Sequence, residues 1–587
     1  MDGSARLPAF LGCGLRVSAV SGGSRLRTPA LAELDLRIRT RLPAAMRCSL
    51  GLDFGTASVR ALVVDVSTGE TLGLGEWAFE HGCDGVLVRE DEPDLARQHP
   101  ADYLEGAVRS TRGALEAAGV DGSSVVGIGV DGTGSTPIPV DGSGEALAIA
   151  GSEEPAAMAW LWKDHTAKQE AEDLVEAVRR AGLPFLGHTG GTYSSEWYWA
   201  KLLCCARRHP DVASRAAAWV ELSDFIPAWL TGRREPSRIL RGVCAAGHKG
   251  MFSSRHGGWP PVSFLAGLHE RLGAWARTLG GRVVRAGERV GGLAPGPAAL
   301  LGLREGIAIS AGALDAHVGA IGSGIREGDV VKVIGTSSCD MAVARGIPLS
   351  GTLRGIAGIV PDSILPGCIG FEAGQAAVGD LFAWGARLLG RSHEELTELA
   401  RGAPSGSGGV VCLDWHNGNR CVLMDPHLRG VLAGLSLGTG PGPFYRSLLE
   451  GSAFGARRIL DRMRELGVPV RRLLACGGIA QKNDLLMQIL ADVLASEILV
   501  AESDQACALG AAMMGAVAAG AFSDFERARE TLVRPPRRRF LPDPVRARAM
   551  ERFYAVYCDL YDAFGTGRPI DARAALRALS GASASAP

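Results

Sequence analysis

Several signatures of common enzyme classes are missing from this chain of 587 residues. No GxxxxGK[ST] string occurs, which argues against a P-loop nucleotide site. No GxGxxG run opens a helix after a strand, which argues against a dinucleotide-binding enzyme. The 13 cysteines include no CxxC pair, so neither a zinc nor a disulfide framework is indicated. This pattern is typical of reduced cysteines in a cytosolic protein.

Long apolar spans and an excess of one charge are also missing. The longest uncharged apolar run, Ala506–Phe522, has 17 residues, whereas a membrane-spanning helix needs about 20 strongly apolar ones. Here we expect a close-packed helix instead. The net charge of −1 provides no field that attracts nucleic acid or anionic membranes. Aromatic residues, at 6%, are too sparse to suggest surfaces for base stacking. Neither nucleic acid nor membrane is predicted as a partner.

Residues 1–47 differ in composition from the rest of the chain. They carry eight arginines against Asp2, Glu33 and Asp35, a local charge of +5, while the remainder has 54 basic and 60 acidic side chains, a charge of −6. An Arg-, Ala- and Ser-rich leader is typical of an organelle transit peptide. The alternative is an upstream extension that does not fold, with translation beginning at Met46. In both cases the segment is excluded from the fold. We expect a cytoplasmic protein, and organelle targeting by residues 1–47 stays open as the alternative.

From Cys48 onward, short apolar runs and glycine turns alternate with amphipathic segments, which predicts an α/β protein. Two β-hairpins are expected, each with a glycine at its turn. Their strands are Ser49–Phe54 and Ala61–Val66 around Gly55-Thr56, and Val330–Ile334 and Met341–Ala344 around Gly335-Thr336-Ser337. Because each half of the chain opens with such a hairpin, we expect two related halves that face one another across a cleft.

The length implies two or more domains, because a single hydrophobic core stops growing at about 250–300 residues. We place the first domain at residues 48–308, the second at 309–565 and a flexible tail at 566–587. The remaining periodic segments predict helices at 100–119, 166–181, 443–466 and 506–519, strands at 125–130, 307–310 and 472–476, and a long loop at 232–262.

The two glycine turns are candidates for phosphate binding. A glycine at the apex lets backbone N–H groups approach an anion without a Cβ in the way, and neighbouring hydroxyls add donors. A carboxylate before the first turn can hold a hydrated magnesium ion. The residues concerned are Asp53, Gly55, Thr56 and Ser58 in the first turn and Gly335, Thr336 and Ser337 in the second. A single turn of this kind is more often a plain hairpin, but two in equivalent places predict a grip on a polyphosphate from both sides.

The paired hairpins resemble the actin/hexokinase/Hsp70 superfamily, in which ATP binds between two ribonuclease-H-like domains. Within it, residues 48–560 or so resemble the FGGY carbohydrate kinases. Two segments are similar to the signatures of that family, YSSEWYWAKL at Tyr193–Leu202 and the segment Gly430–Phe454. Further strings are similar to those of the ribulokinases of the family: DGTGST at 131–136, LWKDHT at 161–166, AGHK at 246–249, VKVIGTSSCD at 331–340, FEAGQ at 371–375, DWHNGNR at 414–420 and GGIAQKN at 477–483.

This resemblance implies transfer of a phosphoryl group from ATP, with Mg²⁺, to L-ribulose, giving the 5-phosphate in the use of L-arabinose; D-ribulose or pentitols stay open as further substrates. One alternative is another sugar or polyol kinase of the same family, although xylulokinase-like proteins usually read WxDxR where this chain has Thr166. The other is a non-catalytic nucleotide-binding regulator on the same fold. A homodimer also stays open.

By the resemblance, Asp315 is the catalytic base and also touches the sugar. Phosphoryl transfer requires a group that accepts the proton of the attacking hydroxyl, and a carboxylate in the cleft suits this task. The alternative is that Asp315 caps the helix that follows it, since Asp is a favoured N-cap residue.

Other nucleotide-side roles follow from the same resemblance. Asp53 faces the metal ion, or else stabilises its turn. Gly477, Gly478 and Asn483 form the adenosine-binding turn, or else a helix entry with Asn483 as its cap. The helix at 506–519 is expected to pack beneath the nucleotide.

On the sugar side, the resemblance assigns contacts to Trp162, Lys249 and Glu372. Lys249 can donate to hydroxyls, Glu372 can accept from them and Trp162 can stack on a sugar face; the alternatives are a core tryptophan, a solvated lysine and a buried helix cap. Asp131 is placed near this pocket, as is Asp164, with structural roles left open. The imidazoles of His165 and His317 lack metal-ligand spacing, so supporting roles are expected.

The chain departs from the pattern of the resembled kinases at two places. Gly132 stands where a threonine is more usual, and the GSEEP segment at Gly151–Pro155 is short. Both changes bear on the sugar rather than on phosphoryl transfer.

Overall fold

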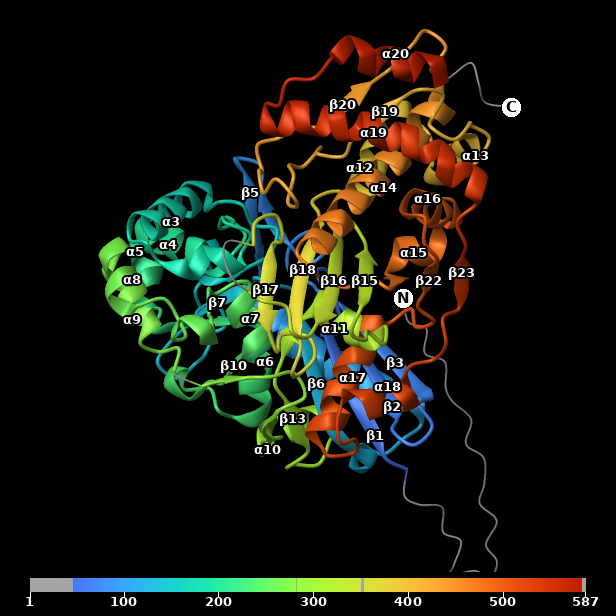
Figure 1. Cartoon of the computed structure of the whole chain (residues 1–587). Helices are drawn as coiled ribbons and strands as arrows, with labels where there is room; N and C mark the ends of the chain where they lie inside the picture. Colours follow the sequence, from blue (N-terminus) through green and yellow to red (C-terminus); the bar gives the residue numbers. More distant parts are fainter. Residues whose placement is uncertain (1–45, 281, 350–352, 583–587) are drawn as a thin grey trace, which may run out of the picture. The chain divides into compact units, whose positions relative to one another are not determined.

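The computed structural model describes residues 46–280, 282–349 and 353–582. Residues 1–46 separate from Arg47–Pro587 as a unit of their own, so the expectations for the leader fall outside the described residues, except at its last two positions. All that follows concerns the part from Arg47 onward (Figure 1). Within the described residues, no helix combines the length and the apolar character needed to cross a bilayer.

The first sheet is built around the fully buried strand β1. It pairs antiparallel with β2, which pairs with β3, and it pairs parallel with β6. The strands in spatial order are β12 (Arg289–Gly292), β13 (Ala308–Ser310), β6 (Val125–Gly132), β1 (Cys48–Phe54), β2 (Ser58–Asp65) and β3 (Thr71–Ala78), with β14 (Ala313–Leu314) also on β6. The expected hairpin around Gly55-Thr56 is therefore confirmed.

The second sheet repeats this plan with other residues. Here β15 pairs antiparallel with β16, which pairs with β18, and it pairs parallel with β21. The order is β17 (Gly358–Pro361), β18 (Ile369–Gln375), β16 (Ser338–Ala344), β15 (Asp329–Ile334), β21 (Arg472–Cys476), β22 (Ile498–Val500) and β23 (Arg538–Phe540). Both sheets contain three consecutive antiparallel strands next to two parallel ones and end on an antiparallel edge strand, β12 or β23; the second sheet adds β17 at its other edge. This shared plan bears out the predicted pair of ribonuclease-H-like halves.

The helices of the two halves surround these sheets, and those of the first half also build a lobe of short elements. In chain order they are α2 (Pro100–Ala118), α3 (Lys168–Arg180), α4 (Tyr198–Arg208), α5 (Pro210–Arg215), α6 (Leu222–Thr231), α7 (Val243–His248), α8 (Val262–Leu268), α9 (Glu270–Ala276), α10 (Pro295–Leu301), α11 (Asp315–Gly322), α12 (Gly379–Leu389), α13 (His393–Arg401), α14 (Pro441–Glu465), α15 (Gly478–Lys482), α16 (Asp484–Leu494), α17 (Ala506–Ala518), α18 (Phe525–Leu532), α19 (Pro544–Thr566) and α20 (Ala572–Ala582).

The short strands outside the two large sheets pair among themselves. They are β4 (Leu87–Arg89), β5 (Glu92–Gln98) and β8 (Ala159–Trp160) in one small sheet, β7 (Pro137–Val140) with β9 (Ala218–Glu221), β10 (Arg241–Gly242) with β11 (Val283–Val284), and β19 (Val411–Leu413) with β20 (Val431–Ala433).

Helix α17 ties the halves together. Although it follows the second sheet in the chain, it packs on β1 and β6 of the first sheet and against α11. Its backbone comes so close that a Cβ on Gly129 would lie 1.8 Å from the carbonyl oxygen of Ala511, so only glycine fits there. Helix α2 covers the other face of the same sheet, where Ala61 of β2 is buried while its neighbour Leu62 faces α17. The uncharged run at 506–522 is thus a close-packed helix, as expected.

Three sequence expectations need correction. The boundary at residue 308 falls inside the first sheet, because β13 and β14 still pair with β6; by sheet membership the second half begins between Leu314 and Asp329. The expected tail contains α20, which packs on α19 and buries Ala575 and Leu579, one helical turn apart. The expected loop at 232–262 contains α7, whose residues are all buried, so that no polar face marks it as a helix in the sequence.

Candidate active site

Three carboxylates meet at the carboxyl ends of neighbouring strands in the first sheet. Asp53, near the end of β1, lies directly beside Asp131 of β6 in the parallel register. On the other side of β6, Leu314 of β14 lies beside Gly132, and Asp315 follows at once as the first residue of α11. The electrostatics agree with this placement, since the charges of Asp53 and Asp315 both raise the pKa of Asp131.

Asp53 and Asp131 are both buried, and burial raises the pKa of each. Arg60 of β2, 3.5 Å from Asp53, opposes this shift for both carboxyls. Within the described part of the chain, neither oxygen of Asp131 accepts a hydrogen bond except by sharing a proton with Asp53. Two adjacent, under-compensated carboxyl groups are a natural site for a cation.

Asp315 is the first residue of α11, and Leu314 occupies the N-cap position. Oδ1 of Asp315 accepts a hydrogen bond from the backbone N–H of Ala316 at 2.7 Å. Burial raises the pKa of Asp315 to about 7; the Ala316 N–H and the charge of Lys249 oppose the rise, and Asp53 adds to it. A carboxyl group whose pKa is near neutrality is suited to proton exchange at physiological pH.

The first glycine turn is connected to the sugar-side tryptophan. The indole Nε1 of Trp162 donates to Oγ1 of Thr56 at 3.0 Å. The carbonyl oxygen of Thr56 accepts a hydrogen bond from the side-chain amide of Gln98 at 2.7 Å, which holds the turn in place. Ser58 is buried and its hydroxyl donates to Glu76 of β3 at 2.8 Å, so this proton is committed within the hairpin. Since the N–H of Gly55 donates to the carbonyl oxygen of Ser58 at 3.0 Å, Thr56 is the predicted residue of this turn that stays available to a ligand.

The second glycine turn lies against the start of α12 and beside the Gly477 turn. The carbonyl oxygen of Gly335 accepts from Gly379 at 3.1 Å, and that of Thr336 accepts from Val378 at 2.8 Å. Gly335 and Thr336 are exposed, and Ser337 is half-buried. The predicted phosphate residues of this turn therefore face outward from a firmly held backbone.

Gly477 separates β21 from α15 and requires a glycine. Its φ is +93°, and a Cβ there would lie 2.6 Å from the carbonyl oxygen of Ile334, the residue before the second turn. Gly478, by contrast, has open space around its Cβ position. The side chain of Asn483 caps α16 by accepting from Leu486 at 2.9 Å. The two glycines thus lie next to the second turn, while Asn483 uses its side-chain oxygen as a cap.

The sugar-side residues Lys249 and Glu372 form a buried ion pair across the two halves. Lys249, which follows α7, donates from Nζ to Oε1 of Glu372 on β18 at 2.7 Å. The side chains are 5% and 11% exposed. Against the desolvation of burial, the charge of Lys249 holds the pKa of Glu372 well below its usual range. Both charges also act on Asp315, which places the pair near that carboxyl group.

The aromatic side chains of the YSSEWYWAKL segment hold Lys249 and the residue after it in place. The hydroxyl of Tyr193 donates to the carbonyl oxygen of Lys249, and Trp199 Nε1 donates to the carbonyl oxygen of Gly250 at 2.8 Å. The ammonium of Lys249 also lies 5.3 Å from the centre of the Trp197 ring. The aromatic residues of this segment therefore fix the lysine rather than face a ligand themselves.

Sequence reasoning missed a second pair between the halves. Glu196 of the first half lies 3.2 Å from Arg420 of the second, with His165 at 3.8 Å from the same carboxylate oxygen. The charge of Glu196 raises the pKa of Arg420. Both residues stand inside strings that resemble family motifs, YSSEWYWAKL and DWHNGNR, but nothing in their spacing showed that they meet.

Other predicted residues serve the scaffold. Asp164 is fully buried, pairs with Arg97 and accepts from the backbone of Ala96 at 2.8 Å, which is a structural role. A cavity of about 680 Å³ lies elsewhere, between the segments around Gly287 and Phe525, and none of the predicted site residues lines it.

Comparison with known proteins agrees with this geometry. The profile of the N-terminal domain of the FGGY family of carbohydrate kinases matches residues 48–322, and the profile of its C-terminal domain matches residues 330–519. Together they cover most of the chain. The chain therefore belongs to the FGGY family of carbohydrate kinases, and it is a sugar kinase.

Curated relatives are similar over nearly the whole chain. A ribulokinase of Shouchella clausii is 39% identical over 548 residues, which are 89% of this chain and 96% of that protein. A ribulokinase of Halalkalibacterium halodurans is 38% identical over 88% of this chain and 95% of its own length. Among solved structures, a xylulose kinase of Rhodospirillum rubrum covers 89% of this chain with a TM-score of 0.72 and 24% identity, and 99% of that structure is matched. That likeness shows the shared fold.

Proposed function

We propose that this kinase transfers the γ-phosphoryl group of ATP to the 5-hydroxyl of L-ribulose, with Asp315 as the general base. The observation that carries the proposal is the position of Asp315. Its carboxyl group lies near both Asp53 and the Lys249–Glu372 pair, because the charges of all three act on its pKa. It therefore stands between the carboxylates beside the first phosphate turn and the groups that can hold a polyol.

The residues present fit the cofactors that the family implies. Asp53 and Asp131 provide buried, under-compensated carboxyl oxygens for Mg²⁺, which prefers oxygen ligands and when bound neutralises charge on the phosphates. The N–H groups of Gly55 and Gly335 donate within their own turns, to the carbonyl oxygens of Ser58 and Ser337. The hydroxyls of Thr56 and Thr336, one on each half, are the groups that these turns offer to a polyphosphate. Gly478, whose Cβ position has no protein atom within 4 Å, leaves space beside the second turn for the nucleoside, and Gly477 lets the backbone pass close to Ile334.

The chain's own residues divide the work on the sugar. Lys249 donates to hydroxyls, and Glu372 accepts from them, so the pair fixes the orientation of a ketose. Trp162 stands beside the first turn and offers a flat face to the sugar while its N–H holds Thr56. Asp315 accepts the proton of the attacking hydroxyl as that oxygen approaches the phosphorus, and the aligned reactants lower the barrier.

The choice of L-ribulose rests on the ribulokinase names of the curated relatives at 36–39% identity and on Thr166, which replaces the arginine usual in xylulokinase-like proteins. The xylulose kinase structures below 25% identity support the fold only. A cytoplasmic location and a homodimer stay predictions of the sequence.

A coupled ADP-release assay against L-ribulose, D-ribulose, D-xylulose, ribitol and glycerol tests the proposal. The expected result is the highest kcat/KM for L-ribulose, with phosphate on C5 of the product by NMR. The Asp315→Asn protein, expressed and purified in the same way, controls for contaminating kinases. Preference for D-xylulose or glycerol would favour another kinase of the family, and ATP binding without turnover on any sugar would favour a regulator.

A further inference from the structure

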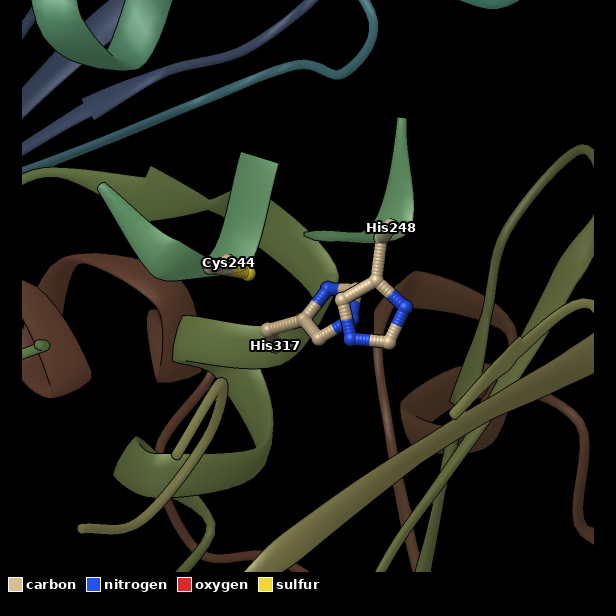
Figure 2. A group of neighbouring side chains, drawn as sticks. All are labelled: Cys244, His248 and His317. Carbon is tan, nitrogen blue, oxygen red and sulfur yellow. The ribbon is translucent and has the colours of Figure 1, made fainter. Parts of the chain in front are cut away.

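Two buried histidines surround the Glu372 carboxylate on the side away from Lys249. Oε2 of Glu372 lies 3.2 Å from Nδ1 of His248 and 3.6 Å from Nε2 of His317. Lys249 holds the other oxygen, Oε1, at 2.7 Å. The histidines come from α7 and α11, and their ring centres are 4.3 Å apart (Figure 2). Three basic side chains, two at the end of α7 and one on α11, thus converge on one acidic group.

The two imidazoles have little else to bind. His248 and His317 are 0% and 1% exposed. Nε2 of His248 is hydrogen-bonded with the hydroxyl of Ser363 at 3.0 Å, which leaves Nδ1 for Glu372. Among the residues that the structure describes, neither ring nitrogen of His317, nor Nδ1 of His248, nor Oε2 of Glu372 has a hydrogen-bond partner. Buried polar groups are normally paired, so these unpaired nitrogens and the unpaired oxygen beside them are suited to bind one another.

We propose that His248 and His317 are positioning residues, which clamp Glu372 against Lys249 so that its carboxylate meets the sugar hydroxyls in one fixed orientation. The proposal rests on the proposed function of the Lys249–Glu372 pair. It adds that the two histidines hold the Glu372 carboxylate in place. A carboxylate held at both oxygens has lost its rotational freedom before the sugar arrives, and pre-ordering of this kind favours binding.

A strand pairing reinforces the clamp. Glu372 pairs with Gly358 of β17, and a Cβ on Gly358 would lie 2.0 Å from Nδ1 of His248. The backbone conformation at Gly358 is one that any residue adopts. A glycine is therefore needed here to make space for the imidazole and not for the backbone. The ring of His248 is therefore seated in a space that only a glycine leaves free.

A metal ion is the competing explanation, because Cys244 lies near the same rings (Figure 2). The ligand atoms of Cys244, His248 and His317 lie within 4.8 Å of one another. Tetrahedral zinc, with bonds of about 2.0–2.3 Å, brings its ligand atoms to about 3.5 Å. The fourth ligand would be an oxygen of Glu372, and this carboxylate already binds the ammonium of Lys249. Because the lysine already neutralises that carboxylate, the charge balance favours the clamp over the metal.

Crossed substitutions test which ring nitrogen acts. An asparagine amide nitrogen takes the place of Nδ1, and a glutamine amide nitrogen takes the place of Nε2. Since Nδ1 of His248 and Nε2 of His317 face Glu372, His248→Asn and His317→Gln should keep the KM for the best sugar of the panel within about threefold. His248→Gln and His317→Asn should raise it about tenfold or more, the effect of losing one hydrogen bond to a charged group, with the KM for ATP unchanged.

Gly358→Ala should raise the sugar KM in the same way, because it displaces the His248 ring. Equal effects of Asn and Gln at both positions would overturn the clamp, since a merely structural role does not distinguish the two nitrogens. Zinc bound at one equivalent in the purified protein and lost in Cys244→Ala would also overturn it; the clamp predicts no zinc and an unchanged sugar KM in that variant.

Crystal structures of the sugar-free protein and of its His248→Gln/His317→Asn variant separate this inference from the proposed function. The clamp predicts a Glu372 carboxylate that is ordered in the first and rotated or disordered in the second. An unmoved carboxylate overturns the clamp whichever sugar the enzyme prefers. Failure of the whole sugar panel with the wild-type protein overturns the proposed function alone.

Discussion

The indole N–H of Trp162 and the hydroxyl oxygen of Thr56 are joined by a hydrogen bond of 3.0 Å. A residue assigned to the sugar thus holds a residue assigned to the phosphates. Because Thr56 accepts through Oγ1, its own proton stays available to a phosphate oxygen. The bond places the sugar face of Trp162 beside the first glycine turn.

Replacement of Trp162 by phenylalanine keeps an aromatic face and removes this donor. We expect kcat/KM for ATP to fall about fivefold, as for one neutral hydrogen bond of about 1 kcal/mol, with a smaller change in the KM for sugar. Steady-state kinetics with each substrate varied in turn measures both. A fall confined to the sugar KM would mean that the hydrogen bond does not serve the nucleotide side.

Gly477→Ala should weaken nucleotide binding without affecting the sugar. The φ of +93° and the close carbonyl of Ile334 leave no space for a methyl group, so the turn must shift. Strain of about 1–3 kcal/mol predicts a rise of about tenfold in the KM for ATP. Gly478→Ala is the informative comparison, because its Cβ meets no protein atom. A loss there reports on space that the nucleotide itself needs.

Asp131→Asn should stabilise the protein while lowering its activity. Burial raises the pKa of Asp131 well above its usual value, so at pH 8 the unfolded chain, in which this carboxyl ionises freely, is favoured relative to the folded state. The neutral amide removes this penalty, and the melting temperature should rise at pH 8. The gain should shrink as the pH falls toward the ordinary pKa of Asp, because the wild-type carboxyl is then protonated in the unfolded chain as well as in the folded state. Thermal unfolding at a series of pH values checks the sign; a lower melting temperature at pH 8 would contradict it.

The pH profile of kcat/KM for the sugar should follow Asp315. A base with a pKa of about 7 must lose its proton to act, so the rate should rise through about pH 7 to a plateau. Lys249 lowers this pKa and Asp53 raises it. Removal of the cation in Lys249→Met should therefore move the rise to higher pH, and Asp53→Asn should move it to lower pH. Shifts in the same direction in both variants would rule out control by these charges.

The sequence predicted the parts of this fold that depend on local chemistry. The hairpins around Gly55 and Gly335 follow from apolar alternation and a glycine turn, and both lie where expected. Parallel pairing is a non-local property, which is why the membership of β13 and β14 in the first sheet was not visible. Helix α7 was missed because it is buried on all sides.

The site was predicted unevenly for the same reason. Motif strings led to Asp315, Lys249 and Glu372 one at a time. The meeting of His248 with His317, 69 positions apart in the chain, and of Glu196 with Arg420, 224 apart, depends on how the halves pack. No short spacing in the sequence could indicate these contacts.

The kinetics of Asp315→Asn with L-ribulose and ATP test the central claim most directly. Asparagine keeps the size of the side chain and its oxygen near the N–H of Ala316, so the fold and the KM values should be preserved. We expect kcat to fall about 10²–10⁴-fold, as for the loss of a positioned general base. A correctly folded variant with the kcat of the wild-type enzyme would contradict it.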